Sequence, residues 1–179
     1  MNSQNNEDTL PYREIPDAPS EFTAGGVVGR MVDGLGFRYY WASEGLTQED
    51  LNFKPSEDAR TTSETIDHIL GLSTTILNSA VDKPNSGNDF SELNFDEKRE
   101  LTLKNLKTAA DIFKESEDLS EFKIIFQNSK GSSEYPFWNH INGPIADAIW
   151  HCGQLVSFRR SSGNPFNSKA SMFMGKLRE

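Results

Sequence analysis

The segment from Asn142 to Pro165 restricts the fold of this chain more than any other, because it carries the signals that begin and end a helix. Pro144 suits the first helical position, where a backbone N–H would have no partner, and Gly143 or Asn142 can cap it. At the far end, Gly163 suits the left-handed residue after the last turn, and Pro165 prevents continuation. The sequence therefore predicts a helix between these two ends.

Two stripes of side chains run along this predicted helix. One is apolar and recurs at helical spacing: Ile145, Ala148, Ile149, Cys152, Leu155 and Val156. The other contains Asp147 and His151, which are four residues apart and therefore stacked about one turn from each other, with Gln154 next along the face. A carboxylate and an imidazole on adjacent turns can both reach one metal ion, so this face is the candidate site.

The composition limits the partners that we expect. A chain of 179 residues is most simply one domain with a sizeable core. Its net charge of -9 argues against binding to nucleic acid or to an anionic membrane surface. Apolar runs are only a few residues long, so no membrane span is expected, and the polar N-terminus predicts a cytoplasmic protein. The single cysteine, Cys152, lies on the apolar stripe and is interpreted as a core residue.

Three further helices are predicted upstream, over about 23–43, 62–81 and 94–116, the last opened by a capping box of Asn94 and Glu97. Glycines in the first of them indicate close approach to a neighbouring helix. Alternating Phe122, Ile124 and Phe126 before a Ser-Lys-Gly-Ser turn predict a short strand or hairpin.

Together these elements predict an all-α, up-down four-helix bundle over residues 21–165, with the short hairpin before its last helix. Residues 1–20 read as an arm that is either disordered or wrapped around the bundle. Residues 166–179 form a tail packed on the bundle, for which Phe166, Met172 and Phe173 are the expected anchors.

The histidines supply the remaining chemistry. His68 lies about two turns into its predicted helix, where it can face Asp147 and His151 across a bundle. Two histidines and one carboxylate leave coordination positions open, as a catalytic metal requires. His140 lies four residues before Pro144 and is expected to pack, to support a ligand or to line the mouth of the site. The alternative is a hydrogen-bonded Asp147–His151 pair and a core histidine at position 68, with no metal.

Two of these segments resemble the DinB-like superfamily, also called the DinB/YfiT-like metalloenzymes. They are TTSETIDHI around His68 and DAIWHCGQLVSFRRSSGNP around His151, and the weaker likeness extends from about residue 24 to 165. The family signature on the last helix is His-x-x-x-His-x-Gly-Gln. His151, Gly153 and Gln154 match it, whereas Asp147 stands where the first histidine is common.

The resemblance implies a four-helix bundle, often a homodimer, with a divalent metal bound by His68, Asp147 and His151. Zinc or nickel is the usual metal, and iron or manganese occurs in some members. Members with assigned activities transfer a small thiol to an electrophile or catalyse a thiol-dependent isomerisation. A thiol or another small molecule is therefore the expected substrate. Asp147 lowers the charge of the site by one relative to histidine, which makes a bound water or thiol less acidic.

Two functions remain open at this point. The first is a metal-dependent transferase or hydrolase that acts through a metal-activated nucleophile. In it Gln154 orients a ligand, and Glu64, one turn before His68, is a candidate general base by position alone. The second is a non-catalytic bundle that binds a small molecule or forms a dimer, with the same polar cluster and no metal. Only the first predicts that a chelator shifts the melting temperature.

Overall fold

The computed structural model of the protein describes residues 10–179, so the first nine residues of the predicted arm lie outside it. Its four long helices are α1 (Ala24–Ser43), α3 (Thr62–Ala80), α4 (Phe95–Glu115) and α6 (Ala146–Ser161). Its short helical segments are α2 (Gln48–Asn52), η2 (Leu119–Glu121), α5 (Trp138–His140) and η3 (Ile141–Ile145). Its strands are β1 (Ile124–Asn128), β2 (Gly131–Tyr135), β3 (Ala170–Ser171) and β4 (Lys176–Leu177).

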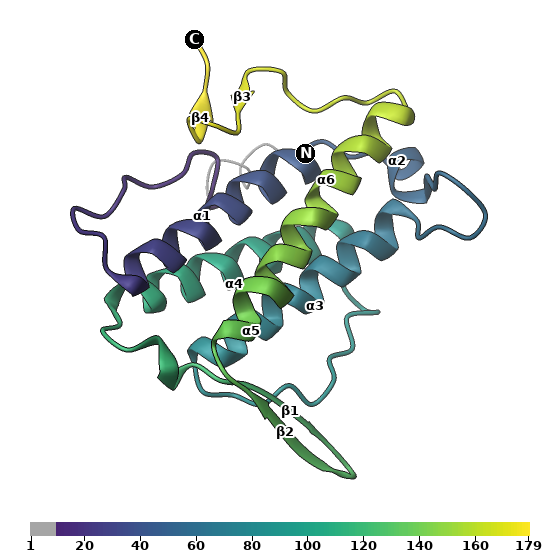
Figure 1. Ribbon diagram of the computed structural model, residues 1–179. Coiled ribbons are helices and arrows are strands. Elements are labelled where there is room, and N and C mark those ends of the chain that lie inside the picture. The colour runs from purple at the N-terminus through teal and green to yellow at the C-terminus, as the bar shows by residue number, and fades with distance from the viewer. Residues whose placement is uncertain (1–9) are drawn as a thin grey trace.

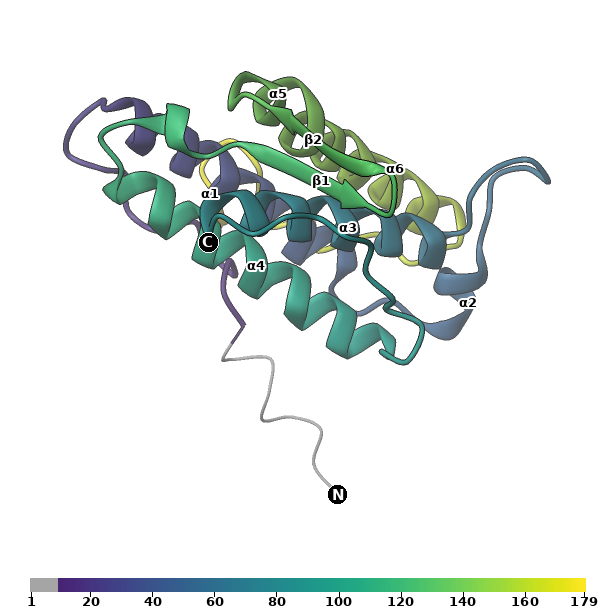
Figure 2. The ribbon, with the colours of Figure 1, turned by 90° about the horizontal axis from the view of Figure 1, so that it is seen from below.

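The long helices pack side by side around one apolar core (Figure 1). Figure 2 shows α4 and α6 on opposite sides of α1 and α3, and each of these outer helices contacts both inner ones. The fold is therefore mostly helical and its packing is compatible with the predicted bundle. Two small antiparallel sheets, β1–β2 and β3–β4, accompany the helices in the described chain, so the all-α class is not confirmed.

Side-chain caps begin the long helices close to the predicted residues. Thr23 Oγ1 accepts the N–H of Gly26, 3.0 Å away, at the start of α1. Asn94 and Glu97 exchange hydrogen bonds at the start of α4, which confirms the predicted capping box. These caps satisfy N–H groups that a helix leaves unpaired at its first turn.

Two glycines of α1 let this helix approach α4 closely. A Cβ atom at Gly25 would lie 2.1 Å from the carbonyl oxygen of Phe113, and one at Gly29 would lie 2.9 Å from that of Ala110. Neither separation leaves room for a side chain. The close helix–helix contact expected from these glycines is confirmed.

The described part of the arm lies along α1. Tyr12 is almost fully buried, and its hydroxyl donates to Asp33 Oδ1 over 3.1 Å. Its ring fills the space beside Gly36, where a Cβ atom would lie 2.3 Å away. Trp41 Nε1 donates to the carbonyl oxygen of Arg13. Of the two alternatives for the arm, the wrapped one therefore holds for residues 10–20.

The C-terminal tail makes a small hairpin of β3 and β4. Phe166 and Met172 pack partly buried against the core, as predicted. Phe173 does not: it is 95% exposed, so its expected role as an anchor is wrong. The physical reason is the tight turn closed by a hydrogen bond from Gly175 N–H to the Ser171 carbonyl, which places Phe173 at the tip of the hairpin.

The last helix starts and stops near the predicted residues, but the predicted cap at Gly143 or Asn142 is absent: η3 leads directly into α6, and no side-chain hydrogen bond caps either of them. The backbone kinks at Gly143, whose φ of −99° and ψ of −113° are not helical, and Pro144 follows at once. Gly163 has a φ of +94°, the left-handed conformation expected after the last turn. Arg159 reaches across from this end to α1, where its guanidinium donates to the carbonyl oxygens of Trp41, Ala42 and Glu44. It thus satisfies the end of a neighbouring helix.

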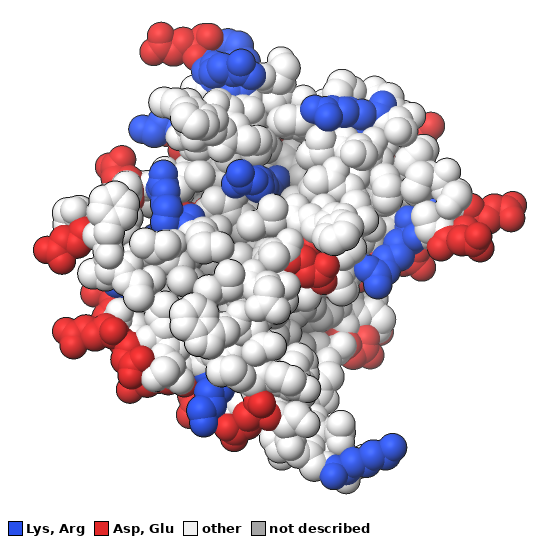
Figure 3. Space-filling model, in the orientation of Figure 1, with Lys and Arg blue, Asp and Glu red and all other residues white. Residues whose placement is uncertain are grey.

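The face on which α1, α5 and α6 lie carries few charges. Figure 3 shows mostly uncharged side chains across its middle and most acidic and basic ones toward its edge. Exposed apolar side chains on these helices include Val27 and Met31 of α1, Trp138 of α5 and Trp150 of α6. Over the part of the chain that the structure describes, we find no helix with the length and apolar character needed to cross a bilayer.

Candidate metal centre

The structure brings together the three ligands that the sequence predicts. His68 projects from α3, and Asp147 and His151 project from adjacent turns of α6. His68 Nε2 lies 3.0 Å from Asp147 Oδ2, and His151 Nε2 lies 3.3 Å from Asp147 Oδ1. One potential ligand atom from each residue lies within 4.8 Å of the other two. The two imidazole rings are nearly perpendicular, with centroids 4.5 Å apart.

These separations fit a shared ion. Ligand atoms bound to tetrahedral zinc at about 2.0 Å lie roughly 3.3 Å from one another. The two nitrogen-to-oxygen distances of this cluster are 3.0 and 3.3 Å, each to a different oxygen of the Asp147 carboxylate. The side chains are also accessible, with 31% of His68 and 40% of Asp147 exposed to solvent. The cluster can therefore bind a cation from solution and leaves room for a further ligand.

Gln154 sets the orientation of the His151 ring. Its side-chain oxygen Oε1 lies 2.8 Å from His151 Nδ1, so Nδ1 carries the proton and donates it. The other nitrogen, Nε2, then presents a lone pair toward the Asp147 carboxylate. A lone pair and a carboxylate oxygen repel each other unless a proton or a cation lies between them. A metal ion removes this repulsion.

His140 is a core residue and does not line the site. It is fully buried, its Nε2 lies 2.7 Å from Ser79 Oγ, and the rings of Phe113 and Phe137 pack against it. Burial lowers the pKa of His140 to about 4, so the ring is neutral at pH 7. Of the three roles considered for this histidine, packing is the one that the structure supports, and a place at the mouth of the site is wrong.

Glu64 is a helix cap, which corrects its candidacy as a general base. Its carboxylate accepts the backbone N–H of Thr61 at 2.7 Å and the Thr61 hydroxyl at 3.1 Å. The same N–H lowers the pKa of the Glu64 carboxyl. Glu64 lies on the first turn of α3, one turn before His68, and both hydrogen bonds that its carboxylate accepts come from Thr61.

A cleft of about 760 Å³ opens beside the cluster, with His68 and Asp147 in its wall. The rest of the wall comes from α3 (Asp67, Gly71, Leu72, Thr75), the loop before α4 (Asn88, Asp89, Phe90, Ser91), Phe126 of β1, and the kink (Gly143, Pro144). This volume lies within the range of small-molecule sites. The loop residues were not predicted as part of the site, because no spacing rule connects an irregular segment to a distant helix.

Asn85 holds the loop side of the cleft in place. Its backbone exchanges hydrogen bonds with Ile125 and Gln127 of β1, and its side chain donates to the Ile125 carbonyl. Asn78 of α3 donates in turn to Asn85 Oδ1, 2.9 Å away. One buried asparagine thus joins the loop, the hairpin and α3. The wall that faces the cluster is therefore fixed to the bundle.

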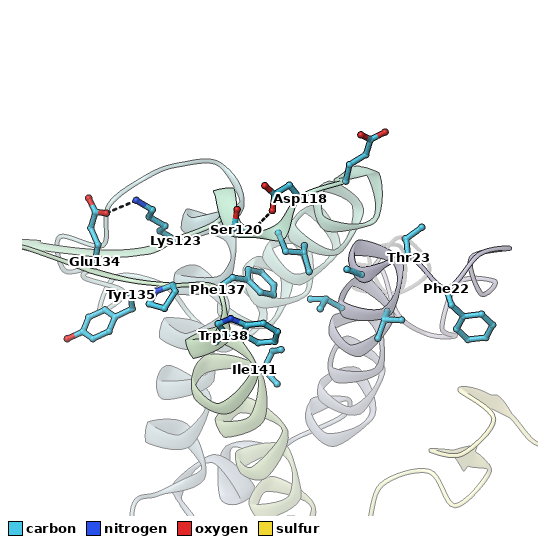
Figure 4. Close-up of a pocket in the computed structure, with 16 residues that line it drawn as sticks. Phe22, Thr23, Asp118, Ser120, Lys123, Glu134, Tyr135, Phe137, Trp138 and Ile141 are labelled. Atoms are coloured by element: carbon cyan, nitrogen blue, oxygen red, sulfur yellow. Dashed lines mark hydrogen bonds and ion pairs between the residues drawn. The ribbon is translucent and has the colours of Figure 1, made fainter.

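A second hollow of about 760 Å³ lies between the start of α1 and α5 (Figure 4). Phe137, Trp138 and Ile141 form its apolar side, and an ion pair of Lys123 and Glu134 lies at its rim. It shares no lining residue with the cleft beside the cluster. The more apolar of the two hollows is thus separate from the residues of the candidate metal centre.

Comparisons with known proteins assign no family. No protein-family model, no curated protein and no solved structure matches this chain. The function has to be argued from the geometry of the site.

Proposed function

We propose that this protein is a divalent-metal-dependent enzyme of the DinB-like type, with the metal bound by His68, Asp147 and His151. The observation that carries the proposal is the arrangement around His151. Gln154 Oε1 accepts a hydrogen bond from His151 Nδ1–H, and this bond turns the unprotonated Nε2 toward Asp147 Oδ1 at 3.3 Å. A cation between Nε2 and the carboxylate satisfies both groups, and in its absence a second proton on the His151 ring has to do so.

The donor set indicates which metals suit the site. Two imidazole nitrogens and one carboxylate oxygen favour zinc, nickel or iron, and manganese accepts the same set more weakly. A bound divalent ion lowers the pKa of a coordinated water or thiol, which generates a nucleophile near pH 7. His151 is held for this task by Gln154, while Asp147 offsets one unit of the charge of the ion. The cleft beside the cluster receives the substrate, so we propose a thiol-dependent transferase or a hydrolase.

The test is metal analysis of protein purified without an affinity tag. We expect about one equivalent of zinc, nickel, iron or manganese per chain, and loss of that metal in His151→Ala and in Asp147→Ala. Asp111→Asn is the matched control, because Asp111 is a half-exposed carboxylate of α4 that pairs with lysines of its own helix. Unchanged metal content in His151→Ala contradicts the ligand assignment.

The second candidate function is homodimer formation through the face of α1, α5 and α6. Two copies of a chain with net charge -9 repel each other, and the repulsion is smallest where both surfaces are uncharged. Trp138 and Trp150 are 75% and 72% exposed on this face, and aromatic residues are enriched in interfaces. We expect Trp150→Glu to give a monomer in light scattering, whereas Phe173→Glu in the C-terminal hairpin does not. A monomeric wild type would contradict this role.

A further inference from the structure

The cleft beside the His68–Asp147–His151 cluster is lined by three acids, and His68 is the one basic side chain in its wall among the described residues. Three carboxylates form part of its wall, those of Asp67, Asp89 and Asp147, and no lysine or arginine of residues 10–179 lines it. Apart from His68, the ionisable side chains of this wall are therefore all acidic.

The three carboxylates differ in how they are compensated. Asp67 pairs with Lys98, whose Nζ lies 2.6 Å away and whose side chain is only 13% exposed. Asp147 belongs to the metal cluster. Asp89 has no cation within ion-pair distance in the described chain, and its Oδ1 accepts the N–H of Ser91 over 2.9 Å. Asp89 thus supplies the uncompensated negative charge of the cleft.

Two aromatic rings accompany this charge. Phe90 follows Asp89 in the loop, and Phe126 lies across on β1, where its side chain is 44% exposed. Leu72 of α3 completes an apolar patch on the same wall. The faces of aromatic rings attract cations, and they do so most strongly when the cation carries methyl groups and is weakly hydrated. Aromatic and apolar side chains next to a carboxylate that has no ion-pair partner suit an ammonium group.

We propose that the cleft selects small ligands that carry an ammonium group and disfavours ligands with an anionic tail. The proposal rests on the proposed function, because the other end of the ligand reaches the metal cluster through a thiolate or another donor. Without the metal, the uncompensated carboxylates alone select for the positive charge. With a divalent ion bound, the charges of the ion, Asp147, Asp89, the bound thiolate and the ammonium group of the ligand sum to zero. Replacing the ammonium group with an anionic group changes this sum by two negative charges.

The experiment uses the cobalt(II)-loaded protein and three thiols of similar size. These are thiocholine, which is cationic, 2-mercaptoethanol, which is neutral, and 2-mercaptoethanesulfonate, which is anionic. Binding is followed by the sulfur-to-cobalt charge-transfer absorption, and each dissociation constant is corrected for the fraction of free thiol that is ionised. We expect thiocholine to bind at least about tenfold more tightly than the sulfonate, with the neutral thiol between them.

Variants locate the effect in the cleft. Asp89→Asn should reduce the preference for thiocholine to about threefold, and Glu92→Gln, an exposed acid of the same loop outside the cleft wall, should leave it unchanged. Gly71→Leu fills the cleft, because a Cβ atom at Gly71 meets no atom within 4 Å. It should abolish thiol binding and keep the cobalt spectrum.

Failure of this proposal and failure of the proposed function give different results. A wild type without a cobalt spectrum contradicts the metal site and says nothing about charge selection. The metal-free protein is therefore also tested with phenyltrimethylammonium and benzenesulfonate by saturation-transfer NMR. Preference for the cation, lost in Asp89→Asn, supports the proposal. Equal binding or a preference for the anion, with either form of the protein, overturns it.

Discussion

His68 and Asp147 are 79 residues apart in the chain, yet Nε2 of the histidine lies 3.0 Å from Oδ2 of the aspartate. Each residue is fixed by a long helix, and the two helices contact each other directly. Sites built on packed helices keep their geometry better than sites built on loops. The arrangement of the cluster therefore depends on the packing of α3 against α6, and changes in that packing should alter metal binding.

Replacing Gln154 should weaken metal binding without removing a ligand. Gln154→Leu takes away the acceptor for the Nδ1 proton of His151, 2.8 Å distant, so the ring loses its preferred tautomer and orientation. We expect the zinc affinity to fall about 10–100-fold. Competition with a chromophoric chelator measures it. Gln154→Glu keeps an acceptor oxygen and serves as the control, and equal dissociation constants for wild type and Gln154→Leu would contradict the role.

Metal should stabilise the folded chain. An ion that binds only the folded state at one hundred times its dissociation constant adds about 2.7 kcal/mol. For a chain of this size, that corresponds to a rise in Tm of roughly 5–10 °C. Differential scanning fluorimetry with zinc, and then with excess EDTA, checks this expectation. His151→Ala should show no rise, and a chelator-insensitive Tm in the wild type would favour the metal-free cluster.

His140 should make the protein less stable as the pH falls. Its pKa is lowered from 6.5 to about 4 by burial, so the unfolded chain binds a proton that the folded chain excludes. The contribution is fully present above pH 6.5 and is lost as the pH falls toward 4. The loss amounts to roughly 3 kcal/mol of the free energy of unfolding.

Urea unfolding between pH 4 and pH 7, in the presence of EDTA, measures this effect. The comparison is with His140→Gln, which keeps a hydrogen-bonding group near Ser79 but does not titrate. The other histidines and the carboxylates are common to both proteins, so the difference between the two pH profiles isolates His140. Parallel profiles would show that the folded protein admits a protonated ring at this position.

Two glycine substitutions should change stability in opposite directions. Gly25→Ala places a methyl group 2.1 Å from the Phe113 carbonyl oxygen and should cost about 1–3 kcal/mol by separating α1 from α4. Gly153 lies in α6 with no atom within 4 Å of its Cβ position, so Gly153→Ala should add about 0.5–1 kcal/mol. Thermal and urea unfolding of both variants measure the difference. A neutral Gly25→Ala would mean that the helices can separate at little cost.

The elements that the sequence predicted well are those with local signals. The cap at Asn94 and the left-handed Gly163 each follow from a few neighbouring residues, and the structure shows both. The spacing of Asp147 and His151 also placed both on one helix face. Hydrophobic periodicity then predicted which sides of the helices face one another, so His68 could be expected opposite them.

What the sequence could not predict depends on long-range contacts. Glu64 is the exception, because its signal is local: Thr61 and Glu64 have the spacing of a capping box, and this partner three residues away determines where the carboxylate lies. Nothing in the sequence around His140 distinguishes a histidine of the core from a histidine of a functional site. The cleft wall contains Asp89 and Phe126, which come together because Asn85 joins the loop to the hairpin. No periodic pattern marks such an irregular tertiary contact.

The hydrogen bonds of Asn85 join the loop and the hairpin to α3, the helix that carries His68. The side chains of the candidate metal centre belong to the helices, whereas Asp89, Phe90 and Phe126 of the cleft wall belong to a loop and a strand that Asn85 joins to α3. Substitutions in residues 86–93 can therefore accumulate without disturbing the bundle. Related proteins with the same cluster could diverge in the molecules that they accept while keeping one chemical step.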